Sequence, residues 1–242
     1  MRTLLLSDIH GNFEALKAVL DFLRDNNIVW DKVVCLGDYV DYGPNPNEVI
    51  EIVKNLNGLC LLGNHDKALI DKGEREYFGD VALKCSLWTE RVIKPDNLEF
   101  LKNLSPYHKD DEMLFIHASP VNPIWHYVYD YGDAEEVFKS SREKIIFLGH
   151  THIPSYFCRY NAKIYGGYVS AEYMKLKLLD NARYIINPGS VGQSRDGIKL
   201  ATFGIFDKKD MTFEWFRIPY DSNATKEKIL KEGLPKTLLA YL

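Results

Sequence analysis

The chain has 242 residues, of which 46% are hydrophobic and 26% are charged. This composition is typical of a globular protein and excludes a disordered polypeptide. Thirty Lys and Arg residues against thirty-four Asp and Glu residues leave a net charge of -4, which supplies no field to hold nucleic acid or an anionic membrane. The apolar run at the N-terminus is too short for a signal peptide, and no run is long enough to span a membrane. We therefore expect a single domain over residues 1–242 that resides in the cytoplasm.

In the first two-thirds of the chain, short apolar runs alternate with helical patterns, as they do in βαβ units. Asn12 can cap a helix whose apolar residues recur at helical spacing, and Pro46 lies near the first turn of another helix. Further helices are predicted over 76–91 and 96–104. The predicted strands of this part are residues 3–6, 33–36, 59–62, 113–116 and 145–148. We expect these elements to form a partly parallel sheet with covering helices.

The pattern changes from Ser155 onward, where we predict an antiparallel meander. Met211, Phe213 and Trp215 alternate with polar residues, as in a strand with one buried face. The turn sequence DKKD joins this strand to the one before it. The predicted strands of this part are residues 156–160, 175–178, 184–186, 200–206 and 211–216.

Five of the apolar runs end in the same way, in polar side chains that can bind a metal ion. These side chains are Asp8 and His10, Asp38, Asn64 and His65, His117, and His150 and His152. We expect the strand ends to converge on one face of a sheet. Nitrogen and oxygen ligands without a thiolate suit divalent metals, and a cluster of this size can hold two ions about 3.5–4 Å apart.

These residues stand in five motifs that together resemble the calcineurin-like metallophosphoesterase superfamily, whose signature runs DxH, GDxxD, GNH(D/E), a lone H and GHxH. This chain has, in the same order, DIH at 8–10, GDYVD at 37–41, GNHD at 63–66, the lone His117 and GHTH at 149–152. The resemblance extends from about Met1 to the segment NPGSVGQSRDG at 187–197. It implies an α/β (α+β) fold, a four-layer αββα sandwich with two mixed sheets.

The resemblance also implies a role for each of these side chains. The ligands would divide between two divalent ions: Asp8, His10 and His152 for the first, Asn64, His117 and His150 for the second, and Asp38 as the bridge. His65 would bind no metal but would protonate the leaving oxygen or stabilise developing charge, and Asp41 would orient it. The ligand set admits Mn, Fe, Co, Ni and Zn.

The resulting hypothesis is a hydrolase that attacks phosphorus with a hydroxide held between two metal ions, since coordination lowers the pKa of water from 15.7 toward about 7. Its substrate would be a phosphodiester or a small nucleotide-like phosphoanhydride, because the fuller pattern resembles the small prokaryotic phosphodiesterase-like branch. Protein serine/threonine phosphatases read GDxxDRG, whereas this chain has Tyr42 in place of the arginine that clamps phosphate. A phosphomonoesterase, including a protein phosphatase, and a non-catalytic metal-binding scaffold are the alternatives.

Two further segments allow two interpretations each. The glycine-rich segment with Ser190 and Arg195 either cradles phosphate oxygens or only forms a turn between strands. The aromatic stretch PIWHYVY around His126 either packs in the core or lines the mouth of the cleft, where it would stack on a nucleobase or an aromatic leaving group. Ser190 and Arg195 are our candidate substrate-binding residues.

Overall fold

The apolar runs form two six-stranded sheets that pack face to face. The computed structural model describes residues 1–242. The first sheet has the order β3 (Leu59–Cys60), β2 (Lys32–Cys35), β1 (Arg2–Leu6), β11 (Ala201–Asp207), β12 (Thr212–Ile218) and β9 (Tyr173–Lys177). The second has the order β4 (Tyr107–Asp110), β5 (Met113–Ile116), β6 (Ile145–Phe147), β10 (Arg183–Asn187), β7 (Ser155–Tyr160) and β8 (Lys163–Tyr168).

Apolar side chains from both sheets fill the space between them. Leu5 of β1, Phe147 of β6 and Trp215 of β12 belong to one buried cluster. The indole N–H of Trp215 also donates a hydrogen bond to the carbonyl of Asn187 in β10, at 2.8 Å. This contact satisfies the only polar atom of a large buried side chain and joins the two sheets.

The strands after Ser155 do not form the predicted antiparallel meander. Strands β7, β8 and β10 lie in the second sheet, whereas β9, β11 and β12 lie in the first. Strand β10 pairs parallel with β6, with Ile185 opposite Ile146. Alternating apolar residues identify a strand but not its neighbour, because pairing depends on contacts between segments distant in sequence. Strands β4 and β8 lie at the edges of the second sheet and are not predicted, because β4 is polar and exposed and β8 contains two adjacent glycines.

Three helices cover the outer faces of the two sheets: α1 (Phe13–Asp25), α2 (Pro46–Asn55) and α6 (Tyr131–Ser140). Leu16 of α1 and Val49 of α2 pack in one buried cluster with Leu4 of β1. Val137 of α6 packs with Ile146 of β6 on the other side of the molecule. The predicted four-layer αββα sandwich is therefore confirmed.

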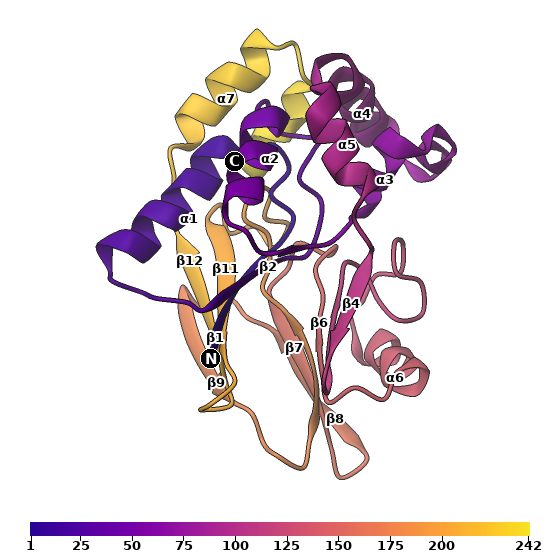
Figure 1. The fold of residues 1–242 in the computed structure, drawn as a ribbon, viewed down its shortest axis with the longest axis vertical. Coiled ribbons are helices and arrows are strands. Elements are labelled where there is room, and N and C mark those ends of the chain that lie inside the picture. The colour runs from indigo at the N-terminus through magenta and orange to yellow at the C-terminus, as the bar shows by residue number, and fades with distance from the viewer.

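The other helices gather at one end of the sandwich, the upper part of Figure 1. They are α3 (Asn64–Ile70), the 3-10 helix η1 (Lys72–Tyr77), α4 (Asp80–Val92), α5 (Pro95–Lys102), α7 (Ser222–Lys231) and the 3-10 helix η2 (Lys236–Tyr241). The helix predicted over 76–91 is thus interrupted between η1 and α4. Ile229 of α7 and Leu238 of η2 pack on Trp88 of α4. None of the helices is long and apolar enough to cross a membrane.

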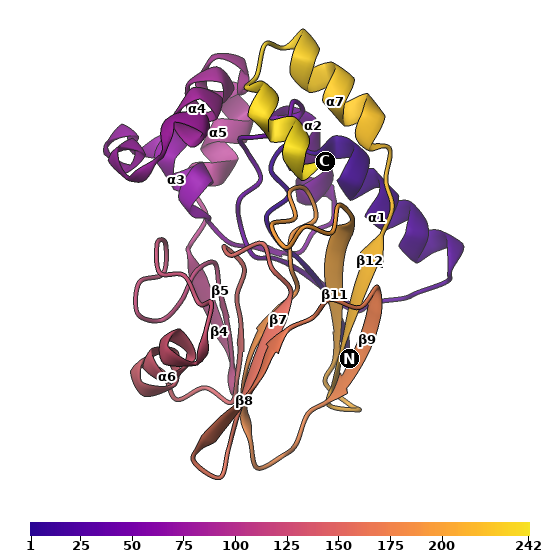
Figure 2. The same ribbon diagram turned by 180° about the vertical axis from the view of Figure 1, so that it is seen from behind.

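The strand ends that carry the motifs come from both sheets, so the expectation that they share one face of one sheet is wrong. Strands β1, β2 and β3 run parallel in the first sheet, and β5 and β6 run parallel in the second. The loops that follow them run toward the helical end of the molecule, as Figures 1 and 2 show from opposite sides. Because the sheets pack face to face, these loops meet between them.

Candidate metal centre

The loops after these strands share an uncommon backbone conformation. Five of the seven predicted ligands have a positive φ in the left-handed region: Asp8 (52°), His10 (46°), Asp38 (58°), His150 (66°) and His152 (60°). This conformation costs roughly 1–3 kcal/mol for a residue that has a side chain, and it persists only where the surrounding structure enforces it. Such strain is typical of functional sites.

Two glycines of the motifs allow the loops to approach each other closely. A Cβ atom on Gly63 would lie 2.0 Å from Oδ1 of Asp38, and one on Gly149 would lie 2.0 Å from Oγ of Ser7. No side chain fits at these distances, so both positions require glycine. The glycine before Asn64 therefore lets the loop after β3 approach the loop after β2, and the glycine before His150 lets the loop after β6 approach the loop after β1.

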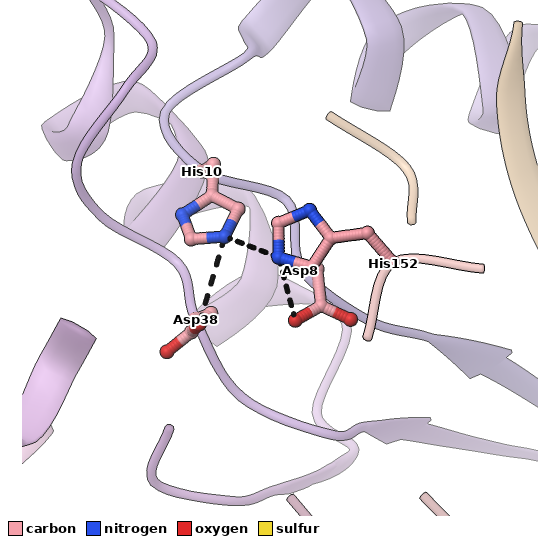
Figure 3. Close-up of side chains that lie close together, drawn as sticks. All are labelled: Asp8, His10, Asp38 and His152. Atoms are coloured by element: carbon pink, nitrogen blue, oxygen red, sulfur yellow. Dashed lines mark hydrogen bonds and ion pairs between the residues drawn. The ribbon is translucent and has the colours of Figure 1, made fainter. Parts of the chain in front are cut away.

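A first group of possible ligands consists of Asp8, His10, Asp38 and His152, all buried and all offering one ligand atom within 4.8 Å of the others. Figure 3 shows their side chains turned toward a common point. Nε2 of His10 lies 3.5 Å from Oδ2 of Asp38, and Nε2 of His152 lies 3.5 Å from Oδ1 of Asp8. The two Nε2 atoms are 3.1 Å apart.

A second group shares Asp38 and adds His117 and His150. Nε2 of His117 lies 3.6 Å from Oδ2 of Asp38 and 3.0 Å from Oδ1 of Asn64. Oδ2 of Asp38 and Nε2 of His150 are buried and have no hydrogen-bond partner. Unpaired buried polar atoms are rare and costly, so these two atoms indicate a missing partner. The structure thus brings all seven predicted ligands together, while their function as ligands stays a prediction.

The hydrogen bonds of the histidines determine which ring nitrogen is free. Nδ1 of His10 lies 2.8 Å from the carbonyl of Val40, and Nδ1 of His152 lies 2.6 Å from the carbonyl of Gln193. A carbonyl only accepts, so each Nδ1 carries the hydrogen and each Nε2 presents a lone pair. Burial lowers the pKa of both imidazoles well below the usual value, which opposes a second proton. Two lone pairs that face each other call for a cation between them.

The carboxylates lead to the same conclusion. Burial raises the pKa of Asp8 to about 7. Burial also raises the pKa of Asp38, as do the neighbouring carboxylates of Asp66 and Asp8. A cation would offset this concentration of buried negative charge. Nitrogen and oxygen donors without a thiolate fit a divalent first-row metal, so the residues present fit the expected cofactor.

His65 stands beside these groups and is held by a chain of hydrogen bonds. Nδ1 of His65 lies 2.8 Å from Oδ2 of Asp41, and the hydroxyl of Thr89 donates to Oδ1 of Asp41 at 2.6 Å. The ring of His65 meets that of His10 edge-on, with centroids 4.9 Å apart. Burial lowers the pKa of His65, whereas Asp41 raises it. Thr89 lies in α4, outside every motif, and no signal in the sequence points to it.

Asp66, the last residue of the GNHD motif, connects two of the loops. Its carboxylate accepts hydrogen bonds from the backbone N–H groups of Asp38 at 2.8 Å, Tyr39 at 2.9 Å and Gly63 at 3.0 Å. It therefore fixes the loop after β2 against the loop after β3. Its place directly after His65 in the GNHD motif is the signal that could have identified it.

The two candidate substrate-binding residues lie in different surroundings. Ser190 is fully buried, donates its hydroxyl to the carbonyl of Asp8 at 2.8 Å and accepts from the N–H of Gln193 at 2.8 Å. It does not line the cavity at the metal centre, whereas Arg195 does. The guanidinium of Arg195 lies over the ring of Tyr42, 5.8 Å from its centroid.

The cavity at the metal centre has a volume of about 100 Å³. Its lining combines polar side chains, among them Asp38, Asn64, His150 and Arg195, with aromatic ones. Trp125 and Tyr127 are among the aromatic lining residues, so part of the stretch PIWHYVY does line the cleft. His126 points elsewhere, because its Nδ1 lies 2.7 Å from the hydroxyl of Ser119. Three larger cavities, of about 280, 370 and 540 Å³, are lined by none of the predicted ligands.

Comparison with known proteins bears on this arrangement. A sequence model described as calcineurin-like phosphoesterase matches residues 1–154. The chain belongs to this family. It is 42% identical to the protein MJ0912 of Methanocaldococcus jannaschii over 96% of this chain and 93% of that protein. The crystal structure of a metallophosphoesterase from Sphaerobacter thermophilus superposes with a TM-score of 0.87 at 33% identity, covering 99% of this chain and 97% of that one.

A more distant relative is the symmetrical bis(5'-nucleosyl)-tetraphosphatase of Coxiella burnetii. It is 30% identical over 56% of this chain, and the match spans 47% of the tetraphosphatase. This similarity therefore concerns about half of each protein.

Proposed function

We propose that this protein is a phosphoesterase that hydrolyses phosphodiesters or small nucleotide-like phosphoanhydrides at a centre of two divalent metal ions. The observation that carries the proposal is the position of Asp38. Its carboxylate belongs to both groups of possible ligands, and its Oδ2 atom is buried without a hydrogen-bond partner. A carboxylate has two oxygens and can bridge two cations.

In this proposal Asp8, His10 and His152 hold one ion and Asn64, His117 and His150 hold the other, with Asp38 between them. Such a pair of ions lowers the pKa of coordinated water and withdraws charge from the phosphoryl oxygens. The protein keeps the centre dry, because the side chains of His10 and Asp38 are at most 1% exposed. Low polarity strengthens every electrostatic contact that the substrate makes there.

His65 is the proposed proton donor to the leaving oxygen. The Asp41 carboxylate accepts from Nδ1–H and favours the protonated ring, so that Nε2–H is the proton given to the leaving oxygen in the cavity that His65 lines. His65→Ala is expected to lower turnover by about 10² to 10⁴, the usual contribution of a general acid, with metal content unchanged. Loss of metal in this variant would instead make His65 a structural residue.

A phosphomonoesterase is the second candidate, and Arg195 is the observation that favours it. The phenol of Tyr42 has no charge and cannot donate two parallel hydrogen bonds, but Arg195 places a guanidinium over the Tyr42 ring in the same cavity. A guanidinium binds two phosphoryl oxygens at once and suits a dianion. The scaffold alternative is less well supported, because His65 and all seven possible ligands are in place.

The test compares two chromogenic substrates with the protein loaded in turn with Mn, Fe, Co, Ni and Zn. Our proposal expects kcat/KM on bis(p-nitrophenyl) phosphate to exceed that on p-nitrophenyl phosphate. The reverse order would favour the phosphomonoesterase. If the metal-loaded protein hydrolysed neither these esters nor a dinucleoside polyphosphate, the scaffold alternative would stand.

A further inference from the structure

Four of the aromatic residues that line the cavity, Tyr77, Phe78, Trp125 and Tyr127, are together called the aromatic wall. It is assembled from two segments almost fifty residues apart in sequence. Tyr77 packs on Trp125 with ring centroids 5.1 Å apart, and Phe78 meets the edge of Trp125 at 5.8 Å. The wall exists only in the folded protein, and no motif of the family includes it.

The wall is continuous with the reaction site. The ring of Phe78 stacks on His65 with centroids 4.6 Å apart and an angle of 25°. The ring of Tyr127 stacks on His150 at 3.8 Å and 20°. A group esterified to a phosphate at the metal centre therefore has the wall as its neighbour.

The wall is held in place by polar contacts behind it. The indole N–H of Trp125 donates to Oε2 of Glu74 at 2.7 Å, and the other oxygen of Glu74 lies 2.5 Å from Nζ of Lys67. Arg75 pairs with Glu90 at 2.6 Å, which ties η1 to α4. A surface that is rigid before binding loses little conformational entropy when a ligand settles on it.

Tyr77 is left with much of its ring in water. Its side chain packs on Trp125, yet the residue is 62% exposed. Large exposed rings beside a cavity are typical of binding surfaces, because a ligand that covers them removes apolar area from water.

We propose that the aromatic wall binds the base of a nucleoside, so that the substrate is a nucleoside phosphodiester or phosphoanhydride; this inference rests on the proposed function. A nucleobase has a flat face that stacks on aromatic side chains. An alkyl ester has no such face. Arg195 is the one Lys or Arg side chain that lines the cavity, and its positive charge suits the phosphate of such a substrate.

The test uses two esters with the same leaving group, thymidine 5'-(p-nitrophenyl phosphate) and methyl p-nitrophenyl phosphate. Hydrolysis of either ester adds one water across the P–O bond to the aryl group and releases p-nitrophenol with thymidine 5'-monophosphate or methyl phosphate. Because the leaving group is shared, the ratio of the two kcat/KM values reports only the nucleoside. We expect a ratio of roughly ten or more, as base stacking on aromatic residues provides.

Two substitutions at one position separate the ring from the hydrogen bond. Both Trp125→Leu and Trp125→Phe remove the N–H that donates to Glu74, but only Trp125→Phe keeps an aromatic ring. The ratio is expected to fall about fivefold or more in Trp125→Leu and to stay within about twofold in Trp125→Phe. Tyr165→Leu is the control, because Tyr165 is an exposed ring on β8 outside the cavity. The methyl ester is measured in each of the four proteins, so that an effect common to both esters cancels in the ratio of the two kcat/KM values.

The outcomes distinguish the inference from the proposed function. Equal kcat/KM on the two esters in the wild type, or equal ratios in the two Trp125 variants, would overturn the nucleoside subsite while the phosphodiesterase stands. If neither ester were hydrolysed, the proposed function would fail, and calorimetry with thymidine 5'-monophosphate and methyl phosphate would judge the subsite. Equal affinities for the metal-loaded protein would then overturn it, whereas tighter binding of the nucleotide that Trp125→Leu abolishes would support it.

Discussion

The guanidinium of Arg195 lies 5.8 Å from the centroid of the Tyr42 ring. Tyr42 lies in the loop between β2 and α2, whereas Arg195 lies in the loop between β10 and β11, about 150 residues later. The contact places a positive charge at the cavity next to Tyr42, the position at which the protein serine/threonine phosphatase pattern GDxxDRG has its arginine. The cation that would face the phosphate is therefore supplied by a different part of the chain.

Replacing Arg195 is expected to affect a phosphomonoester more than a phosphodiester. Charge-assisted hydrogen bonds contribute about 1.5–3 kcal/mol, so Arg195→Ala should lower kcat/KM on the monoester by roughly 10- to 100-fold. Arg195→Lys keeps the positive charge but loses the two parallel N–H donors of the guanidinium. Its kcat/KM on the monoester should therefore lie between those of the wild type and Arg195→Ala. Steady-state kinetics on both substrates, with metal content measured in parallel, tests this. An equal loss on both esters would show that Arg195 does not bind the additional charge of the monoester.

Thr89→Val should lower turnover through Asp41 and His65. The change keeps the shape of the side chain but removes the hydroxyl that donates to Oδ1 of Asp41 at 2.6 Å. The loss of one such hydrogen bond corresponds to about 1 kcal/mol, or roughly fivefold in kcat. Thr89→Ser should restore most of the activity, and metal content should not change.

A double-mutant cycle shows whether Thr89 acts through the histidine. In a His65→Ala background, Thr89→Val should cause no further loss, because the residue that Asp41 orients is gone. If the two losses multiplied instead, Thr89 would contribute by another route.

Removal of metal should destabilise the wild type more than a variant without the shared carboxylate. Chelation leaves Asp38 buried beside Asp8 and Asp66, all with raised pKa values. Asp38→Asn removes one of these charges and keeps the Oδ1 atom that accepts from the N–H of His65. Without metal, we expect this variant to be more stable than the wild type by about 1–2 kcal/mol.

With metal present the order should reverse, because only the wild type has the Asp38 carboxylate that we propose as the bridge. Urea denaturation of both proteins, with EDTA and with added Mn, measures the difference. A wild type whose midpoint is the same under both conditions would contradict the proposed centre.

Glu143, distant from the metal centre, should make part of the stability depend on pH. Burial raises the pKa of Glu143, but hydrogen bonds from Lys109 at 2.6 Å and from Ser141 prevail and lower it to about 2. A carboxylate whose pKa is lower in the folded protein stabilises it above its unfolded value of 4.5, and this contribution disappears as the pH falls toward 2.

Glu143→Gln should therefore lower the free energy of unfolding by about 1–2 kcal/mol at pH 7 and by much less near pH 2.5. The figure at pH 7 is small because the partner Lys109 is exposed and solvent screens its charge. Denaturant titrations of wild type and variant at both pH values measure the effect. The exposed Glu227→Gln is a matched control that should show no such difference. An equal cost at both pH values would indicate that shape rather than charge matters at this position.

Much of the candidate site is visible in the chain itself. Asp8, Asp38 and His117 each follow an apolar run, and such runs predict buried strands whatever their neighbours are. The motifs then identify the possible ligands without any coordinates. Asn12 as the cap of α1 is equally local, because capping involves atoms only three residues apart.

Other features depend on which segments meet in space, and local patterns carry no such information. Residues 184–186 predict a strand, but its local pattern does not name its neighbour. Its parallel pairing with β6 depends on packing between segments that are distant in sequence. Thr89 reaches Asp41, and Tyr77 reaches Trp125, only because α4 and η1 fold over the ends of both sheets. The residue types and their spacing therefore determined the possible metal ligands, whereas long-range packing decided the pairing of the strands, the support of His65 and the shape of the cavity.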